Sequence, residues 1–112
     1  LRKLMDDPAV WQDSELTGDK IVHLVGTNRT YIQQAAKQLG FDNLSDMINR
    51  RRIDYVCQQL RKDPNTPVQN LFTDAGYRSR TTAWRHFTTI VGCTPSEFVE
   101  RHADGERTLK ES

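Results

Sequence analysis

The sequence predicts an all-α fold, and three observations support this prediction. Alternation of apolar and polar residues at a period of two is nowhere sustained, whereas apolar residues recur at spacings of three and four. Residues typical of helix starts and stops are frequent along the chain. A pair of short helical segments also occurs twice, on either side of one long helical segment. The 112 residues are enough for one compact domain.

Residues 1–14 are expected to form an upstream connector with a first helix. Apolar residues stand at helical spacing in the first five positions. Pro8 either breaks this helix or restarts it at a first-turn position, with Asp7 as a possible cap. Trp11 is expected to pack on the segments that follow.

Residues 15–43 are predicted to form a helix-turn-helix unit. Thr17 is expected to cap a short helix that ends at Gly26, since glycine tolerates the left-handed conformation at a helix end. Asn28 is expected to cap a second helix two residues later. Two short helices joined by a tight turn at a glycine are typical of this motif. The apolar residues expected to face inward are Ile21, Leu24, Val25, Ile32, Ala35, Ala36 and Leu39.

The longest helix is predicted from about Leu44 to about Lys62, as the linker of residues 44–63. Pro64 and Pro67 end it, because proline cannot continue a helix. Consecutive arginines at positions 50–52 point in three directions on a helix, so at least one, foremost Arg52, is expected to pack inward and pair with a carboxylate or carbonyl groups. The buried stripe is expected to be Leu44, Met47, Ile48, Ile53, Val56, Cys57 and Leu60.

The helix-turn-helix pattern then repeats in residues 64–101. Thr66 is expected to cap a helix with Pro67 at its first position, Gly76 to end it, and Ser79 to cap the next helix. The first caps, the closing glycines and the second caps of the two units are 49, 50 and 51 residues apart. A repeated unit is a stronger signal than either copy alone. The first helix of this unit is expected to bury Val68, Leu71, Phe72 and Ala75.

A short closing helix is expected after Gly92, with Pro95 in its first turn and Phe98 as its apolar anchor. Residues 102–112 carry no apolar stripe and are expected to be disordered.

The second helix of each unit presents a polar side without an acidic residue. In residues 80–91 this side holds Arg80, Thr81, Trp84, Arg85 and Thr88, and the apolar side holds Ala83, Phe87, Ile90 and Val91. The corresponding side of the first unit holds Arg29, Thr30, Gln33, Gln34 and Lys37. An α-helix fits the major groove of B-DNA, where Arg can bind guanine and Thr or Gln can reach base edges. Trp can cover a thymine methyl, and Ser79 with its neighbouring amides would lie near a phosphate.

Each of these residues also has a purely structural interpretation. Trp84 could be a residue at the boundary of the core. Arg78 could be a solvated turn residue, and Gln33 and Gln34 could be good helix formers on a wet face.

The distribution of charge favours a polyanionic partner. The chain has a formal net charge of +1, but Lys20 to Gly92 hold eleven Lys or Arg against five Asp and no Glu, a balance of +6. A basic centre with acidic ends is a plausible footprint for nucleic acid.

Other kinds of site lack support in the sequence. Cys57 and Cys93 match no zinc spacing and are expected to be reduced thiols. The histidines His23, His86 and His102 have no ligand partners at helical spacing, so we expect no metal. Since no phosphate loop, nucleophile elbow or pair of carboxylates occurs, we expect neither a cofactor nor catalysis.

The duplicated unit resembles the DNA-binding domain of the AraC-type (AraC/XylS) transcription regulators over about residues 15–101. The strongest match is "AGYRSRTTAWRHFTTIVGCTPSEF", and "LVGTNRTYI" and "INRRRI" resemble the first unit and the linker. The matching residues are Gly76, Tyr77, Ser79, Arg85, Phe87, Gly92, Pro95 and Phe98. The chain departs from the family pattern at Ala83, where a large apolar residue is usual, near Ala36, at Thr88 and Thr89 in place of lysines, and at the shifted Gly40-Phe41.

The resemblance implies about seven helices in two helix-turn-helix subdomains joined by the long helix. It also implies that two recognition helices, residues 29–38 and 80–91, enter successive major grooves on one face of bent DNA. The base-reading positions would be Thr30, Gln33, Gln34, Arg80, Thr81, Trp84 and Arg85. Phosphate contacts are expected from Asn28, Arg29, Lys37, Arg78, Ser79 and Thr88.

We therefore expect a bacterial, cytoplasmic protein that binds double-stranded DNA sequence-specifically, regulates transcription and contacts RNA polymerase. Because the chain begins without Met, it is expected to be a fragment of a longer protein, whose upstream part could carry a membrane span. The resemblance implies that sensing or dimerisation parts lie elsewhere in the full-length chain, so this fragment alone is expected to be a monomer. The alternative is an all-helical protein–protein module without DNA binding, in which Trp84 and Arg80 would be interface anchors.

Overall fold

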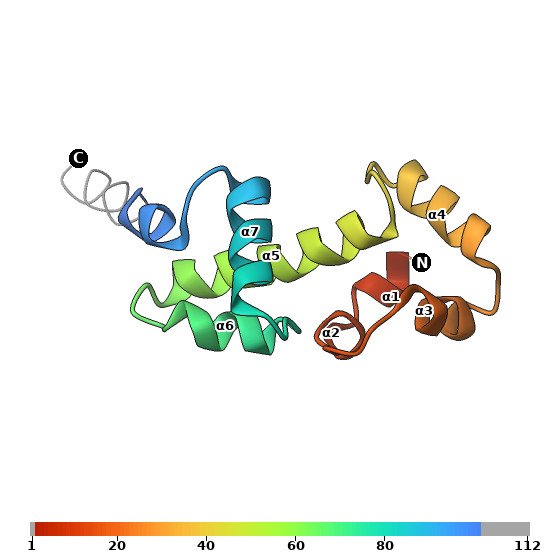
Figure 1. Cartoon of the computed structure of the whole chain (residues 1–112), viewed down its shortest axis with the longest axis horizontal. Coiled ribbons are helices and arrows are strands. Elements are labelled where there is room, and N and C mark those ends of the chain that lie inside the picture. Colours follow the sequence, from red (N-terminus) through yellow and green to blue (C-terminus); the bar gives the residue numbers. More distant parts are fainter. Residues whose placement is uncertain (1, 102–112) are drawn as a thin grey trace.

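The computed structural model describes residues 2–101, and every regular element within that range is a helix (Figure 1). Residues 95–101 are helical in addition to the labelled elements. The all-α prediction is therefore confirmed, while the expected disordered tail, 102–112, lies outside the described residues. The labelled helices are α1 (Arg2–Met5), α2 (Pro8–Trp11), α3 (Gly18–Val25), α4 (Arg29–Gln38), α5 (Leu44–Lys62), α6 (Val68–Asp74) and α7 (Arg80–Val91).

The long helix α5 runs between two groups of helices, which gives the molecule an elongated shape (Figure 1). Helices α3 and α4 lie at its amino-terminal end with α1, and α6 and α7 lie towards its carboxyl-terminal end. The principal dimensions are 53 × 27 × 21 Å. Two separate clusters of buried residues lie along α5, one in each group. This arrangement confirms two helix-turn-helix units joined by a linker helix.

The helix starts follow from capping side chains. The side chains of Asp7, Thr17, Asn28 and Ser79 each accept a backbone N–H of the first turn, as predicted. Gly26 ends α3 at φ 76°, in the left-handed region. The prediction for Thr66 is wrong by one residue. Here Pro67 is the cap of α6 and no side-chain bond is made, since the extended Pro67 itself turns the chain into the helix.

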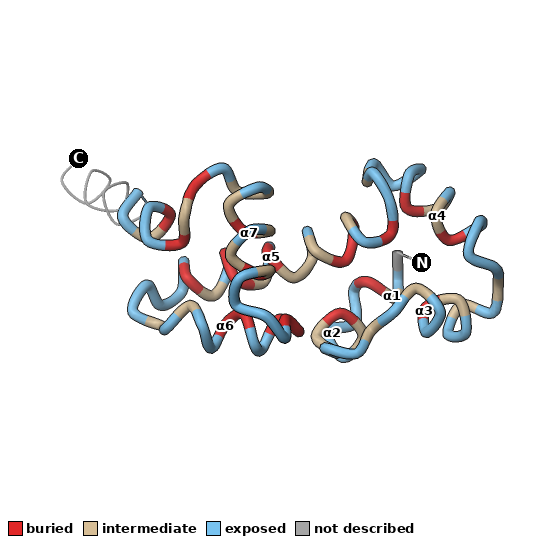
Figure 2. The backbone as a smooth tube through the Cα atoms, viewed as in Figure 1, coloured by how far each residue is buried: buried red, intermediate tan, exposed pale blue. Residues whose placement is uncertain are grey.

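Burial follows the predicted stripe along α5, where all seven expected residues are buried (Figure 2). Two predictions elsewhere are wrong, because Leu24 is 58% exposed and Leu39 is 39% exposed. Helix α3 is rotated so that Val22 packs beside Ile21 where Leu24 was expected. Leu39 is the C-cap that follows α4, so its side chain lies beyond the last helical residue that the first core covers. Cys57 and Cys93 are buried free thiols, as expected, and burial raises the pKa of Cys57 to about 11.

Arg52 ties the amino-terminal segment to the junction of the two units. Its Nε donates to the carbonyl of Trp11 at 2.8 Å, and its Nη2 donates to the carbonyl of Asp13 at 2.9 Å. The guanidinium also lies 5.3 Å from the ring centroid of Tyr77, and burial lowers its pKa. The prediction that Arg52 packs inward against carbonyl groups is confirmed, and Trp11 is buried against Tyr55 of α5 as expected.

Candidate nucleic-acid interface

The second unit orients α7 by burying one side of it. Ala83 and Phe87 are fully buried in the second core, and Phe87 makes edge-on contacts with Phe72 and Phe98. The opposite side, which we call the α7 reading face, holds Arg80, Thr81, Trp84, Arg85 and Thr88. Arg80, Thr81 and Arg85 are exposed, whereas Trp84 and Thr88 are half-buried. The structure therefore brings the predicted residues of this unit onto one accessible surface.

The position of Trp84 is compatible with both of its predicted roles. Part of the indole packs against the second core, as a boundary residue would. The remainder lines a shallow hollow of about 250 Å³ together with Arg80 and Thr81. The core contact holds the indole in place and leaves apolar surface available for a ligand.

The corresponding α4 reading face consists of Arg29, Thr30, Gln33, Gln34 and Lys37. Ile32 and Ala36 are buried on the other side of α4, while all members of the face except Gln33 are exposed. Gln33 is half-buried because its Oε1 accepts the N–H of Leu44 at 2.9 Å, the first residue of α5. This bond satisfies a helix N-terminus and weighs against a base-reading role for Gln33.

The cations on the two reading faces differ in their partners. Among residues 2–101, no ion pair engages Arg80, Arg85 or Lys37. Arg29 pairs with Asp19 at 3.5 Å, and Arg78, in the turn before α7, pairs with Glu15 at 2.9 Å. Neither ion pair was predicted from the sequence. The partners Glu15 and Arg78 are 63 positions apart in the chain, so no local pattern connects them.

The caps of the two reading helices leave hydrogen-bond donors at their N-termini. Asn28 uses its Oδ1 to accept the N–H of Tyr31, and Ser79 uses its Oγ to accept the N–H of Thr82. The amide hydrogens of Asn28 and the hydroxyl hydrogen of Ser79 can therefore still donate to an anion. Thr88 differs, because its hydroxyl donates to the carbonyls of Trp84 and Arg85 at 3.1 and 3.0 Å.

Tyr31 is a candidate contact that the sequence analysis did not single out. Its side chain is 56% exposed, and it follows Thr30 on the outward side of α4. The available signal was its spacing, three residues after the cap Asn28 and three residues before Gln34.

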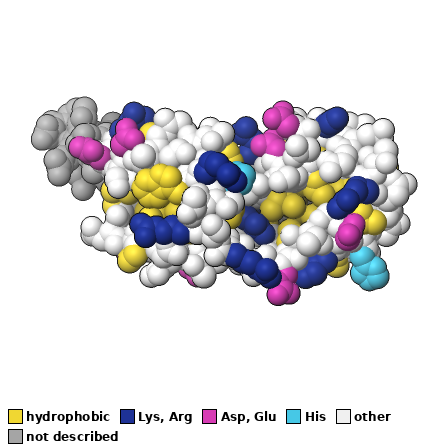
Figure 3. Space-filling view, viewed as in Figure 1, with side chains coloured by type: hydrophobic (Ala, Val, Ile, Leu, Met, Phe, Trp, Pro, Cys, Tyr) yellow, Lys and Arg dark blue, Asp and Glu magenta, His cyan; other side chains and the backbone are white. Residues whose placement is uncertain are grey.

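The surface view shows basic side chains along the whole length of the molecule, with exposed apolar surface between them (Figure 3). Several acidic side chains lie beside Lys or Arg on this view. The helices α4 and α7 themselves contain no acid. Local electrostatics at these two helices therefore favour an anionic ligand.

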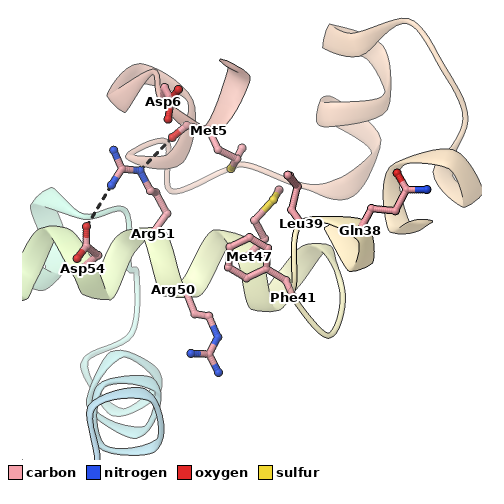
Figure 4. Close-up of a pocket in the computed structure, with 9 residues that line it drawn as sticks. All are labelled: Met5, Asp6, Gln38, Leu39, Phe41, Met47, Arg50, Arg51 and Asp54. Carbon is pink, nitrogen blue, oxygen red and sulfur yellow. Dashed lines mark hydrogen bonds and ion pairs between the residues drawn. The ribbon is translucent and has the colours of Figure 1, made fainter. Parts of the chain in front are cut away.

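A larger hollow of about 690 Å³ lies between α1, the end of α4 and α5 (Figure 4). Its guanidinium groups have internal partners. Arg50 bonds Asp46, and Arg51 donates to the carbonyl of Met5 and to Asp54. This hollow therefore offers no unpaired guanidinium to a phosphate, in contrast to the α7 reading face. Its apolar lining consists of Met5, Leu39, Phe41 and Met47.

Two further properties concern the described part of the chain. No group of three or more His, Cys, Asp or Glu side chains within it could hold a metal ion. None of its helices has the length and apolarity required to cross a membrane.

Two outward, acid-free helices on one linker helix define the class of a tandem helix-turn-helix DNA-binding domain. The family model described as "Helix-turn-helix domain" matches residues 21–101. The chain belongs to this family, the AraC-type helix-turn-helix domains.

Individual proteins agree with this assignment. The chain is similar to the regulatory protein SoxS of Escherichia coli strain K12, with 27% identity over 104 residues, which cover 89% of this chain and 96% of SoxS. The same values hold for SoxS of Escherichia coli O157:H7.

Two solved structures share the fold. One is the C-terminal domain of AraT, a response regulator from Geobacillus stearothermophilus, with a TM-score of 0.78, 15% identity, and coverage of 89% of this chain and 83% of that one. The other is a protein from Listeria innocua, with a TM-score of 0.69, 20% identity, and coverage of 82% and 86%.

The family assignment decides between the two functions that the sequence left open. The chain binds DNA sequence-specifically in the regulation of transcription. Its relatives are bacterial.

Proposed function

We propose that α4 and α7 enter successive major grooves on one face of a DNA duplex and read bases from there. The observation that carries the proposal is the pair of outward, acid-free helices packed on a single linker helix. The long dimension of the molecule, 53 Å, exceeds one turn of B-DNA, about 34 Å. One copy of the domain is therefore long enough to lie along two adjacent major grooves.

On α7, we propose Arg80, Thr81, Trp84 and Arg85 as base-reading residues. Arg80 and Arg85 have exposed guanidinium groups without an ion-pair partner among the described residues. An unpaired arginine can bind the O6 and N7 acceptors of guanine with two hydrogen bonds. Thr81 and Trp84 add a hydroxyl and an apolar surface for the neighbouring base.

On α4, we propose Thr30 and Gln34 as base-reading residues, because both are exposed. Gln33 stays a prediction, since its side chain would have to leave the N–H of Leu44 to reach a base. Its bond to α5 supports a different task, which is to hold α4 at a fixed angle to the linker.

Phosphate contacts are proposed for Asn28, Arg29, Lys37, Arg78 and Ser79. The free donors on the two cap residues and the positive ends of the helix dipoles support this assignment. Thr88 remains a weaker candidate, because its hydroxyl hydrogen already serves the helix backbone. Phosphate contacts should dominate affinity, so binding should fall steeply as salt is raised.

The domain division is proposed as 15–43, 44–63 and 64–101, with residues 1–14 as a connector and 102–112 as a tail. Met5 and Trp11 of the connector are buried against α5 and its neighbours, so this part belongs to the folded unit.

RNA polymerase and an upstream sensing or dimerisation domain are proposed as partners, and this chain alone is proposed to be a monomer. We propose that the protein acts in the cytoplasm, where its DNA lies, and that it has no catalytic activity.

Selection from random duplexes, followed by binding assays on the selected site and a scrambled site, tests the proposal. Arg85→Ala is expected to cost about 1–3 kcal/mol on the selected site and less on the scrambled one. Lys62→Ala is the control, since it removes an exposed cation of α5 outside both reading faces. An equal loss on both sites for Arg85→Ala would rule out a base-reading role.

A further inference from the structure

The hollow on α7 contains an apolar surface, which binding to phosphates alone would not require. Trp84 forms its apolar part, and Arg80 and Thr81 lie one turn earlier on the helix. Its volume, about 250 Å³, is several times the roughly 30 Å³ occupied by one water molecule. It therefore has room for the edge of a base.

The position of the indole is fixed by its surroundings. The core contact of Trp84 restricts its movement, and the core beside it includes the fully buried Phe87 and Ala83. An apolar surface held in this way contributes to binding without a large loss of side-chain freedom.

The major groove offers few apolar groups that could fill such a hollow. Thymine is the only standard base that presents a methyl group there, at C5, and its O4 acceptor lies beside that methyl. A methyl against Trp84 with O4 near the hydroxyl of Thr81 or the guanidinium of Arg80 would match both parts of the hollow.

We propose that the hollow formed by Arg80, Thr81 and Trp84 binds the 5-methyl edge of one thymine and so selects a 5-methylpyrimidine at that position. This inference rests on the proposed entry of α7 into the major groove. It applies to the second unit alone, because Gln33, the residue of α4 that corresponds to Trp84, is bonded to Leu44.

The test removes the methyl group and leaves the base pairing unchanged. Each thymine of the selected site is replaced in turn by deoxyuridine, and the affinity of the purified chain is measured. At one thymine in the α7 half-site we expect a loss of about fourfold, which corresponds to the roughly 0.8 kcal/mol of a buried methyl group. Cytosine at that position should bind less tightly than 5-methylcytosine.

The Trp84→Ala variant supplies the decisive comparison. Its affinities for the thymine and uracil sites should be equal, while Gln34→Ala, the control on α4, should keep the fourfold ratio. The ratio within one variant does not depend on how much of that variant is folded, so loss of stability in Trp84→Ala does not affect the reading.

Three outcomes are informative. A methyl effect that disappears only in Trp84→Ala supports the hollow. Retention of the effect in Trp84→Ala, or no sensitive thymine in the presence of sequence-specific binding, overturns it and leaves the proposed function intact. No preference for the selected site over a scrambled one overturns both.

Discussion

In the first unit the glycine of the turn between α3 and α4, Gly26, is exposed, whereas the corresponding Gly76 of the turn between α6 and α7 is buried together with Tyr77. A Cβ added at Gly26 would meet no atom within 4 Å. A Cβ added at Gly76 would lie 2.8 Å from the carbonyl oxygen of Trp11 and 3.0 Å from that of Gln12. Tyr77 is also fixed, by its hydroxyl bond to Asn49 at 2.8 Å and by the guanidinium of Arg52. The second turn is therefore held by α5 and the amino-terminal segment together.

At two corresponding core positions, the two units carry one large and one small side chain in the opposite order. Counting from the caps, Ile32 and Ala36 of α4 correspond to Ala83 and Phe87 of α7, and all four are fully buried. The large residue thus lies one helical turn later in the second unit. Ala83 is small where the family pattern usually has a large apolar residue, and Phe87 occupies the core beside it.

The exposed apolar side chains also divide unequally. Leu24, Tyr31 and Leu39, the large hydrophobic residues that are exposed within the described range, all belong to the first unit. These contrasts indicate that the second unit is the more rigidly fixed of the two. The first unit should tolerate changes that the second does not.

The largest expected effect is on the free energy of unfolding, when the core residues Ala83 and Phe87 of α7 are changed. Phe87→Ala should lower the free energy of unfolding by about 3–5 kcal/mol, because it leaves a cavity among aromatic rings. The double variant Ala83→Ile/Phe87→Ala recreates the order found in the first unit and should recover part of that loss. Denaturant unfolding measures both. Strictly additive losses in the double variant would contradict the idea that the two positions share one volume.

The two turn glycines provide the next comparison. Gly76→Ala should cost about 3 kcal/mol, since it adds a steric clash with backbone oxygens to the strain of a positive φ. Gly26→Ala should cost only about 1 kcal/mol, because its surroundings are open. Thermal and denaturant melts of both variants distinguish them. Equal losses would show that the second turn is no more constrained than the first.

A smaller effect is expected from the carboxylates that pair with the phosphate-contact arginines. Glu15→Gln frees Arg78 and removes an anion close to the DNA, so affinity at low salt should rise by about two- to fivefold, as exposed pairs are worth up to about 1 kcal/mol. Asp19→Asn, its counterpart in the first unit, should do less because its ion pair is longer. Weaker binding by Glu15→Gln would mean that Glu15 positions Arg78 for DNA.

The smallest expected effect is on the pH dependence of the free energy of unfolding, through His86 of the second unit. Burial lowers the pKa of His86, with Arg85 and Arg52 adding to the shift, and its ring stacks on Tyr77. The unfolded chain then binds the proton more readily, so stability should decline gently as pH falls below about 6.5. His86→Gln should flatten this part of the stability profile measured by denaturant unfolding. An unchanged profile would assign the decline to other groups.

Sequence patterns correctly predicted the features that depend on interactions between residues close together in the chain. The bounds of α5 and four helix caps follow from spacing and from residues that act within one helical turn. The failures concern contacts between distant segments. The exposure of Leu24 depends on how α3 rotates against the first core, and the bond of Gln33 depends on where α5 begins. Arg52 could be predicted to pack inward, but its partners, the carbonyls of Trp11 and Asp13, could not be identified from spacing.

The central claim is that two reading faces held by one rigid linker engage one duplex at a fixed spacing. Binding to the selected site should be measured after inserting about five base pairs, half a helical turn, between the two half-sites. The account predicts that affinity falls to that of a site with a single half-site, because α4 and α7 can no longer face their grooves together. Unchanged affinity after the insertion would contradict it.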